Sequence, residues 1–72
     1  MTSGPAKIPT SEARVGDRLR AHNGLELTVT RIDDAFMGRS DMVAFVEDSG
    51  VQWLKMPAFR DGEVELVRRG AA

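Results

Sequence analysis

The stretch from Met42 to Met56 most constrains how this chain can fold. Two apolar segments, 42–47 and 51–56, flank the polar tripeptide Asp48-Ser49-Gly50. A short polar linker that closes with glycine is typical of a β-hairpin turn, because glycine readily adopts positive φ. Successive residues of a strand point to opposite faces, and both segments carry apolar residues at successive positions. The predicted hairpin therefore has two apolar faces, and a small core covers only one of them.

A three-residue turn fixes the predicted register of this hairpin. The pairs that it sets are Phe45 with Trp53, Ala44 with Leu54 and Met42 with Met56. The predicted core face carries Met42, Ala44, Val46, Leu54 and Met56, and the opposite face carries Val43, Phe45, Val51, Trp53 and Lys55. A slip of one residue exchanges the two faces. In that alternative, Trp53 is a core residue and not a surface residue.

Three further segments, 14–21, 25–30 and 63–67, alternate apolar and polar residues as half-buried strands do. The dipeptide Asn23-Gly24 predicts a hairpin between the first two of them. Ile32 is out of phase with the apolar residues before it, which predicts a bulge near residues 30–31 or a bend. Pro57 cannot donate a hydrogen bond within a sheet, so we expect a 3₁₀-like turn there, with Phe59 plugging the end of a barrel.

The order of these elements resembles that of the SH3-like small β-barrels. The resemblance rests on turn motifs, namely Val15-Gly16-Asp17, Asn23-Gly24, Asp48-Ser49-Gly50 and Pro57-Ala58-Phe59. It implies an all-β, five-stranded SH3-like barrel with a 3₁₀ turn before the last strand. The first motif is similar to that of many small bacterial barrels, including KOW-type and RNA-polymerase-interacting domains. The chain has no tyrosine, which argues against the recognition of polyproline peptides by paired tyrosines.

The length of 72 residues allows one domain, with limited apolar surface to bury. We expect a flexible tail over residues 1–12, a barrel over 13–68 and a frayed end over 69–72. Without cysteine, the chain can form no disulfide or thiolate metal site, so packing or self-association must stabilise it. The N-terminal segment has no long apolar run, so we expect a cytoplasmic protein that does not enter membranes.

No residue pattern in the sequence is typical of catalysis or metal binding. The residues considered are Ser40, Ser49, His22 and Asp48 for catalysis, and Asp33, Asp34 and Asp41 for a divalent cation. The first set shows no spacing that suggests a nucleophile beside its base. The second does not match a calcium-binding loop, and a single histidine argues against a zinc site. We therefore expect no enzymatic activity, no metal and no cofactor.

The main functional hypothesis is a protein-binding module that acts through an aromatic face. Tryptophan is enriched at interface hot spots, and large exposed apolar patches usually mark interaction sites. The long loop 33–41 adds Phe36 and Met37, which either join the site or fold back as a lid on the barrel. The predicted partner-binding residues are Val43, Phe45, Val51, Trp53, Lys55, Phe36 and Met37. The partner is another protein or a second copy of the chain.

The alternative hypothesis is a nucleic-acid-binding barrel. The net charge of −1 lacks the basic excess that usually supplies phosphate affinity, but eight of the ten basic residues are arginine. Arg18 and Arg20 share one face of the first strand, and Trp53 or Phe36 could stack on bases. The candidate phosphate contacts are Arg14, Arg18, Arg20, Arg31 and Arg39.

Overall fold

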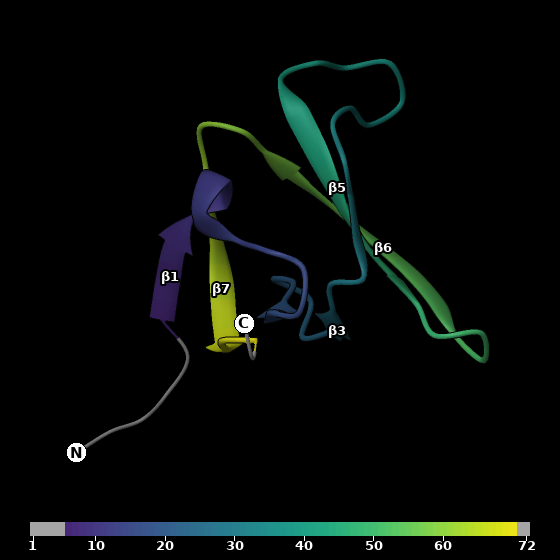
Figure 1. The fold of residues 1–72 in the computed structure, drawn as a ribbon. Coiled ribbons are helices and arrows are strands. Elements are labelled where there is room, and N and C mark those ends of the chain that lie inside the picture. Colours follow the sequence, from purple (N-terminus) through teal and green to yellow (C-terminus); the bar gives the residue numbers. More distant parts are fainter. Residues whose placement is uncertain (1–5, 71–72) are drawn as a thin grey trace.

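The computed structural model describes residues 6–70, which form seven strands and one 3₁₀ turn, without an α-helix in that range (Figure 1). The elements are β1 (Ala6–Pro9), η1 (Thr10–Glu12), β2 (Arg18–Arg20), β3 (Glu26–Thr28), β4 (Arg31–Asp33), β5 (Met42–Asp48), β6 (Trp53–Phe59) and β7 (Glu63–Arg68). One antiparallel sheet has the order β1-β7-β2-β3 and the other has the order β4-β5-β6. The all-β prediction is confirmed. The two sheets do not close into the predicted five-stranded barrel.

The core lies between the inner faces of the two sheets. Its buried apolar residues include Leu19, Leu27 and Val64 from the first sheet and Phe45 and Met56 from the second. These side chains alternate with polar neighbours on β2 and β3, as the period of a half-buried strand requires. Burial of a side chain as large as leucine or phenylalanine contributes about 1.5–3 kcal/mol, so these few residues provide much of the stability of a chain this short.

The chain crosses from one sheet to the other between β3 and β4. The carbonyl of Val29 accepts a hydrogen bond at 2.8 Å from the N–H of Gly16, which lies in the turn before β2. The next residue, Thr30, donates its N–H to the carbonyl of Val46 on β5 at 2.7 Å. Val29 therefore bonds to the turn before β2 and Thr30 bonds to β5, and this bend explains why Ile32 is out of phase with the apolar residues of β3.

The register of the β5–β6 hairpin corrects the sequence prediction. Asp48 lies opposite Trp53, and Phe45 lies opposite Met56, which is a shift of three residues from the predicted pairs. The turn holds four residues, 49–52, and closes with the Ser49 N–H donating to the Gln52 carbonyl at 3.1 Å. An odd shift exchanges the faces of one strand relative to the other. β6 keeps its predicted inward and outward residues, whereas Val43 and Phe45 on β5 turn into the core.

The central strand β5 is buried on both faces, which explains its uninterrupted apolar sequence. Val43 and Phe45 face the core, and Ala44 and Val46 on the opposite face are also buried. β5 lies between β4 and β6, so side chains of both neighbours flank its outer face. The apolar excess on this strand is therefore covered within the chain and does not require a partner.

The two ends of the described chain are more ordered than the sequence predicts. In place of a flexible tail over residues 1–12, β1 pairs with β7 and η1 follows it; residues 1–5 lie outside the described residues. In place of a frayed end from residue 69, the Asp17 carboxylate accepts hydrogen bonds from the Gly70 N–H and the Arg69 guanidinium, both at 2.8 Å. Residues 71–72 also lie outside the described range. Asp17 is buried, and its two partners hold residues 69–70 against the start of β2.

The predicted 3₁₀ turn before the last strand is absent, because β6 continues through Pro57 to Phe59. β6 is an edge strand, where a residue without an N–H donor is tolerated. The one 3₁₀ turn of the described chain lies instead at η1. Phe59 consequently does not plug a barrel end; it is exposed at the end of β6.

Candidate binding surface

Every second residue of β6, starting at Trp53, points away from the core. These residues are Trp53, Lys55, Pro57 and Phe59, and all four are exposed. The Trp53 and Phe59 side chains are each 54% exposed. A strand rises about 3.3 Å per residue, so the two aromatic rings stand roughly 20 Å apart along one face. The outer face of the β4-β5-β6 sheet thus carries large apolar side chains that the core does not use.

The 34–41 loop presents a second apolar group beside this face. Phe36 and Arg39 exchange two backbone hydrogen bonds, with N···O distances of 3.2 and 2.9 Å, and so close a two-residue turn over Met37 and Gly38. Both turn residues have positive φ, +51° at Met37 and +80° at Gly38. Positive φ is unfavourable for methionine, and asparagine or glycine normally occupies this position. The turn nevertheless holds Met37 in solvent, 86% exposed.

Two cationic side chains connect the loop to β6. The Lys55 Nζ lies 5.6 Å from the Trp53 ring and 5.9 Å from the Phe36 ring. The guanidinium carbon of Arg39 lies 5.7 Å from the Phe59 ring. A cation within about 6 Å of an aromatic centroid is attracted to the ring. The loop and the strand therefore form one continuous surface, the aromatic surface, which consists of Phe36, Met37, Arg39, Trp53, Lys55 and Phe59.

The charges on the aromatic surface are partly compensated. Lys55 Nζ lies 3.8 Å from the Asp33 carboxylate, and Arg39 pairs with Asp41 at 2.7 Å. Hydrogen bonding from Arg39 lowers the pKa of the Asp41 carboxyl. Lys55 and Asp33 come from the two strands that flank β5, so their pairing reaches across the buried outer face of that strand. The ion pairs fix the cations against the rings and leave the surface close to neutral.

Four of the seven predicted partner-binding residues lie on this surface: Phe36, Met37, Trp53 and Lys55. Val51 is 96% exposed in the β5–β6 turn, at the end of the hairpin away from the 34–41 loop (Figure 1). Val43 and Phe45 are core residues, as the corrected register requires. Phe59 was not among the predicted site residues, because proline was expected to end the strand. The alternation of Trp53, Lys55, Pro57 and Phe59 is the sequence signal that identifies it.

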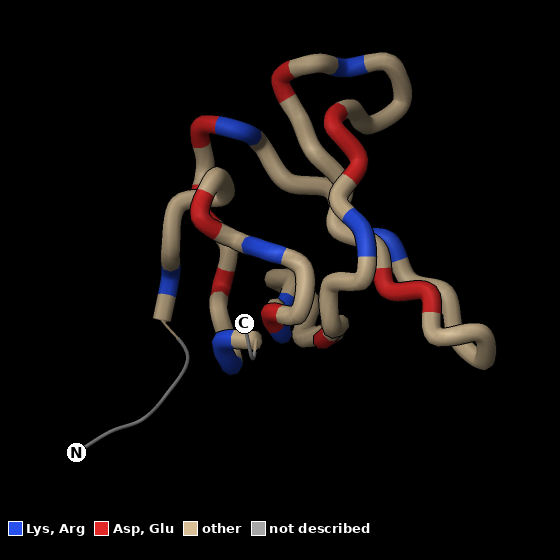
Figure 2. Tube along the Cα trace, in the orientation of Figure 1, with Lys and Arg blue, Asp and Glu red and all other residues tan. Residues whose placement is uncertain are grey.

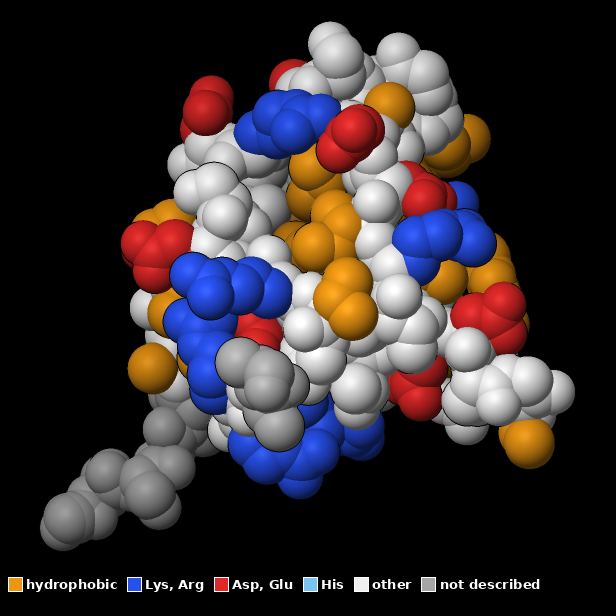
Figure 3. Space-filling model, in the orientation of Figure 1, with side chains coloured by type: hydrophobic (Ala, Val, Ile, Leu, Met, Phe, Trp, Pro, Cys, Tyr) orange, Lys and Arg blue, Asp and Glu red, His pale blue; other side chains and the backbone are white. Residues whose placement is uncertain are grey.

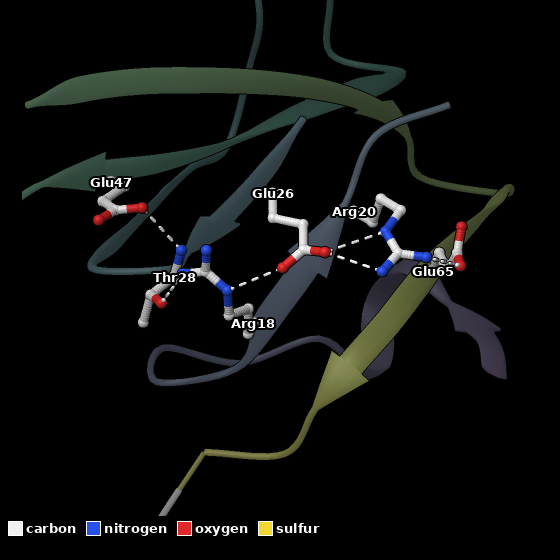
Figure 4. A network of polar contacts seen from close by, with 6 residues as sticks. All are labelled: Arg18, Arg20, Glu26, Thr28, Glu47 and Glu65. Carbon is white, nitrogen blue, oxygen red and sulfur yellow. Dashed lines mark hydrogen bonds and ion pairs between the residues drawn. The ribbon is translucent and has the colours of Figure 1, made fainter. Parts of the chain in front are cut away.

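The predicted arginine stripe lies on the outer face of the other sheet, where acidic residues neutralise it (Figure 4). Arg18 pairs with Glu26 at 3.0 Å, and Arg20 pairs with Glu26 at 2.8 Å and with Glu65 at 3.1 Å. Arg18 also donates to the Thr28 hydroxyl at 2.9 Å. Hydrogen bonds from Arg20 and Arg18 lower the pKa of the Glu26 carboxyl. This network uses the guanidinium groups that a phosphate would have to contact.

The remaining predicted arginines do not extend this stripe. Arg31 pairs with Asp33 at 2.9 Å, and Arg39 belongs to the aromatic surface. Arg14 is exposed in the segment before β2, where its backbone N–H donates to Asp17 at 3.0 Å. Basic and acidic residues are interspersed along the described trace in Figure 2. Only Arg18 and Arg20 share an element, and acidic partners lie beside four of the five predicted arginines.

Comparisons with protein-family models, curated proteins and solved structures returned no match. Within residues 6–70, no helix is long and apolar enough to cross a membrane. Over the same range, no three histidine, aspartate or glutamate side chains gather as metal ligands would. His22 and Ser49 lie exposed in two different hairpin turns. The aromatic surface remains the best-defined candidate site.

Proposed function

We propose that this protein is a non-enzymatic binding module that contacts another protein through the aromatic surface. The observation that carries the proposal is the exposure of Trp53, Phe59 and Met37 on one side of the molecule. A domain with so small a core gains stability from every apolar residue that it buries, so leaving three large ones in solvent needs a reason. Large exposed apolar patches usually mark interaction sites, and tryptophan is enriched among the residues that dominate binding energy.

The conformation of Met37 supports the same proposal. A non-glycine residue at positive φ costs about 1–3 kcal/mol, and such residues cluster at functional sites. Met37 recovers none of this cost by packing, because its side chain is 86% exposed. Methionine is flexible and polarisable, and proteins use it on surfaces that adapt to a partner. The loop thus holds an adaptable apolar side chain directly after Phe36, whose ring lies beside Lys55 together with that of Trp53.

The second candidate function is the binding of single-stranded nucleic acid. The observation in its favour is the placement of Lys55 and Arg39 among Trp53, Phe36 and Phe59, since such proteins combine cations with stacking rings. We rank it below protein binding because both cations have acidic partners and the chain is nearly neutral. Phosphate binding would have to replace these ion pairs.

Self-association is a specific form of the protein-binding proposal. Most homodimers bring the same patch of two copies together about a two-fold axis. The aromatic surface suits such an arrangement because it holds both signs of charge, with Lys55 beside Asp33 and Arg39 beside Asp41.

We also propose that the architecture is a variant of the SH3-like small barrels. The antiparallel pairing of β2 with β3, β4 with β5 and β5 with β6, and the return of β7 to β2, support this.

The proposal is tested by partner capture with two matched variants. Trp53→Ala removes the largest ring of the aromatic surface, and Leu25→Ala removes an exposed apolar side chain from the β2–β3 turn. Immobilised wild-type protein should capture a protein that the Leu25→Ala variant also captures and the Trp53→Ala variant loses. Capture should change little with added salt, whereas nucleic-acid binding should weaken steeply. Equal capture by both variants would contradict the proposal.

A further inference from the structure

The strand β6 is the longest sheet edge of the molecule. The edge strands of the two sheets are β1 and β3 in one, and β4 and β6 in the other. The first three have three or four residues each, whereas β6 has seven. Proteins usually keep exposed edges short, because a long edge offers unpaired N–H and C=O groups to another strand. Among the edges within residues 6–70, only β6 is long enough to pair extensively with another chain.

Every second residue of β6 directs its backbone groups toward this free edge. The Val46 carbonyl on β5 accepts a hydrogen bond from the residue that precedes β4, so Val46 bonds toward β4. The residue opposite Val46 on β6 is Lys55, whose N–H and C=O therefore point away from β5. Bonded and unbonded pairs alternate in an antiparallel sheet, so Trp53, Pro57 and Phe59 share this direction. Pro57 fits here, because its missing N–H leaves no gap in the pairing with β5.

No strand of the described chain covers the free edge of β6. A groove of about 600 Å³ borders residues 55–59, and residues of the β2–β3 turn and of β7 form its other side. In Figure 1 and in Figure 3, the β5–β6 hairpin projects from the body of the molecule, with its turn at the lower right. A lysine on an edge strand usually discourages pairing. Lys55 instead reaches across β5 to Asp33 on β4, 3.8 Å away, and so leaves the edge open.

The sequence of β6 is complementary to itself. Trp53 and Phe59 lie three residues before and three residues after Met56. An antiparallel pair of β6 strands centred on Met56 therefore places Trp53 of each copy beside Phe59 of the other. Aromatic pairs across neighbouring strands stabilise a sheet. The same register places Lys55 beside Pro57, whereas a register centred on Lys55 would oppose two like charges.

We propose that two copies of this protein pair through their β6 edges, antiparallel and centred on Met56, into one continuous six-stranded sheet. The Lys55 N–H of each copy then donates to the Pro57 carbonyl of the other, and the Phe59 N–H donates to the Trp53 carbonyl. Each copy covers the exposed half of the other's Trp53 and Phe59 rings. A two-fold axis of this kind is the commonest symmetry of homodimers. The inference rests on the proposed protein binding through the aromatic surface and names a second copy as the partner.

Sedimentation of the full chain over a series of concentrations measures dimerisation, and amide hydrogen exchange locates the interface. The Lys55 and Phe59 amides face the free edge, whereas the Met56 amide faces β5. As the concentration rises, exchange at Lys55 and Phe59 should slow, and exchange at Met56 should change much less. A protein that stays monomeric up to millimolar concentration would overturn the inference, while capture of a different protein would still support the proposed function. A dimer with unchanged exchange at Lys55 and Phe59 would also overturn it.

Two substitutions at Lys55 form a matched pair for the edge itself. Lys55→Pro and Lys55→Ala both remove the cation, and only Lys55→Pro removes the N–H that the second copy needs. Two hydrogen bonds are lost by symmetry, so Lys55→Pro should dimerise about tenfold or more weakly than Lys55→Ala. Equal dimerisation by these variants, with loss in Trp53→Ala, would overturn edge pairing and leave the aromatic surface as the interface. If Lys55→Pro does not fold, amide exchange in the wild type decides the question.

Discussion

The outer faces of the two sheets use the same kinds of residues in opposite ways. On the β1-β7-β2-β3 sheet, Arg18 and Arg20 face acidic residues on neighbouring strands, and the network closes on itself. On the β4-β5-β6 sheet, Trp53 and Phe59 extend from an edge strand and remain half exposed. On the first face, the charged side chains pair with one another. On the second face, the apolar side chains remain exposed and could be covered by a partner.

The difference follows from the positions of the strands. β2 lies between β3 and β7, so a charged residue on its outer face has a cross-strand neighbour on each side. β6 has a neighbour on one side only, and the residues opposite Trp53 and Phe59 are Asp48 and Met42. The comparison teaches that a stripe of arginines is a weak sign of nucleic-acid binding until its partners are known. An aromatic residue on an edge strand is a better sign of binding.

The largest difference in unfolding free energy should be between alanine variants of Phe45 and Trp53. The sequence predicts these two residues as a cross-strand pair, and the structure places them on opposite faces of the sheet. Phe45→Ala removes a ring that is 1% exposed and should destabilise the protein by about 3–5 kcal/mol. Trp53→Ala should cost less than about 1 kcal/mol, because surface substitutions have small effects. Urea unfolding measures both free energies. Equal losses of unfolding free energy would mean that Trp53 is a core residue, and they would contradict the difference between the outer faces of the two sheets.

A smaller effect should come from Asp17, the most buried of the acidic residues that pair with arginine. Burial raises its pKa, but hydrogen bonds from the Gly70 and Arg14 N–H groups, together with Arg69, outweigh burial and lower it. Its stabilising contribution is therefore complete above the unfolded pKa of about 3.9 and is lost as the pH falls through the lower folded value. Asp17→Asn should cost about 2–3 kcal/mol at pH 7.

The pH dependence sharpens this prediction. The difference in unfolding free energy between wild-type protein and the Asp17→Asn variant should be largest near neutral pH and should shrink below about pH 4. Thermal unfolding of both proteins across this pH range measures the difference. A constant difference at every pH would show that the Asp17 charge contributes nothing to stability.

Met37 should show a smaller effect of opposite sign. Met37→Asn places a residue that tolerates positive φ in the turn, so it should raise stability by about 0.5–1 kcal/mol. If the aromatic surface binds a partner, the same change should weaken that binding, because it removes an exposed apolar group. Gly38→Ala serves as the control for the turn, since it adds strain at φ +80° without removing Met37. A Met37→Asn variant that is both more stable and fully able to bind would exclude Met37 from the site.

The smallest effect should be that of the arginine network. Exposed or partly exposed ion pairs contribute about 0–1 kcal/mol each, so the double variant Arg18→Ala/Arg20→Ala should fold with nearly normal stability. It should also keep the protein partner that Trp53→Ala loses. Capture of the partner and binding of a single-stranded oligonucleotide can be measured side by side. An oligonucleotide that binds the wild type strongly but not this double variant would favour the nucleic-acid hypothesis.

The sequence predicted the all-β class and five of the seven strands, because turn and alternation signals are local, and it missed the short strands β1 and β4. Asn23-Gly24 and the alternating residues 25–30 identify a hairpin without reference to the rest of the chain. The hairpin register could not be predicted, because a three-residue and a four-residue turn fit Asp48-Ser49-Gly50 equally well. The correct register depends on which of Val43 and Ala44 faces a core that distant strands build. That choice moved Phe45 from the predicted site into the core.

The candidate site was predicted in part for a related reason. Trp53, Lys55, Phe36 and Met37 lie on the surface in the structure, as the main hypothesis expects, but their proximity depends on how the 34–41 loop folds. Arg60 fixes that loop through carbonyl oxygens, and a sequence pattern carries no information about such contacts. The same applies to the arginines, whose acidic partners lie up to 45 residues away in the chain.

The environment of Trp53, the single tryptophan of the chain, decides whether the aromatic surface is exposed. Its fluorescence and its quenching by iodide and acrylamide can be measured over a series of protein concentrations. In dilute protein, we predict an emission maximum at the long wavelength typical of a solvent-exposed tryptophan, and efficient quenching. When a partner or a second copy covers the aromatic surface, the maximum should shift to shorter wavelength and quenching should become less efficient. Blue-shifted emission that resists both quenchers at every concentration would show that Trp53 is buried within the chain and would contradict the account.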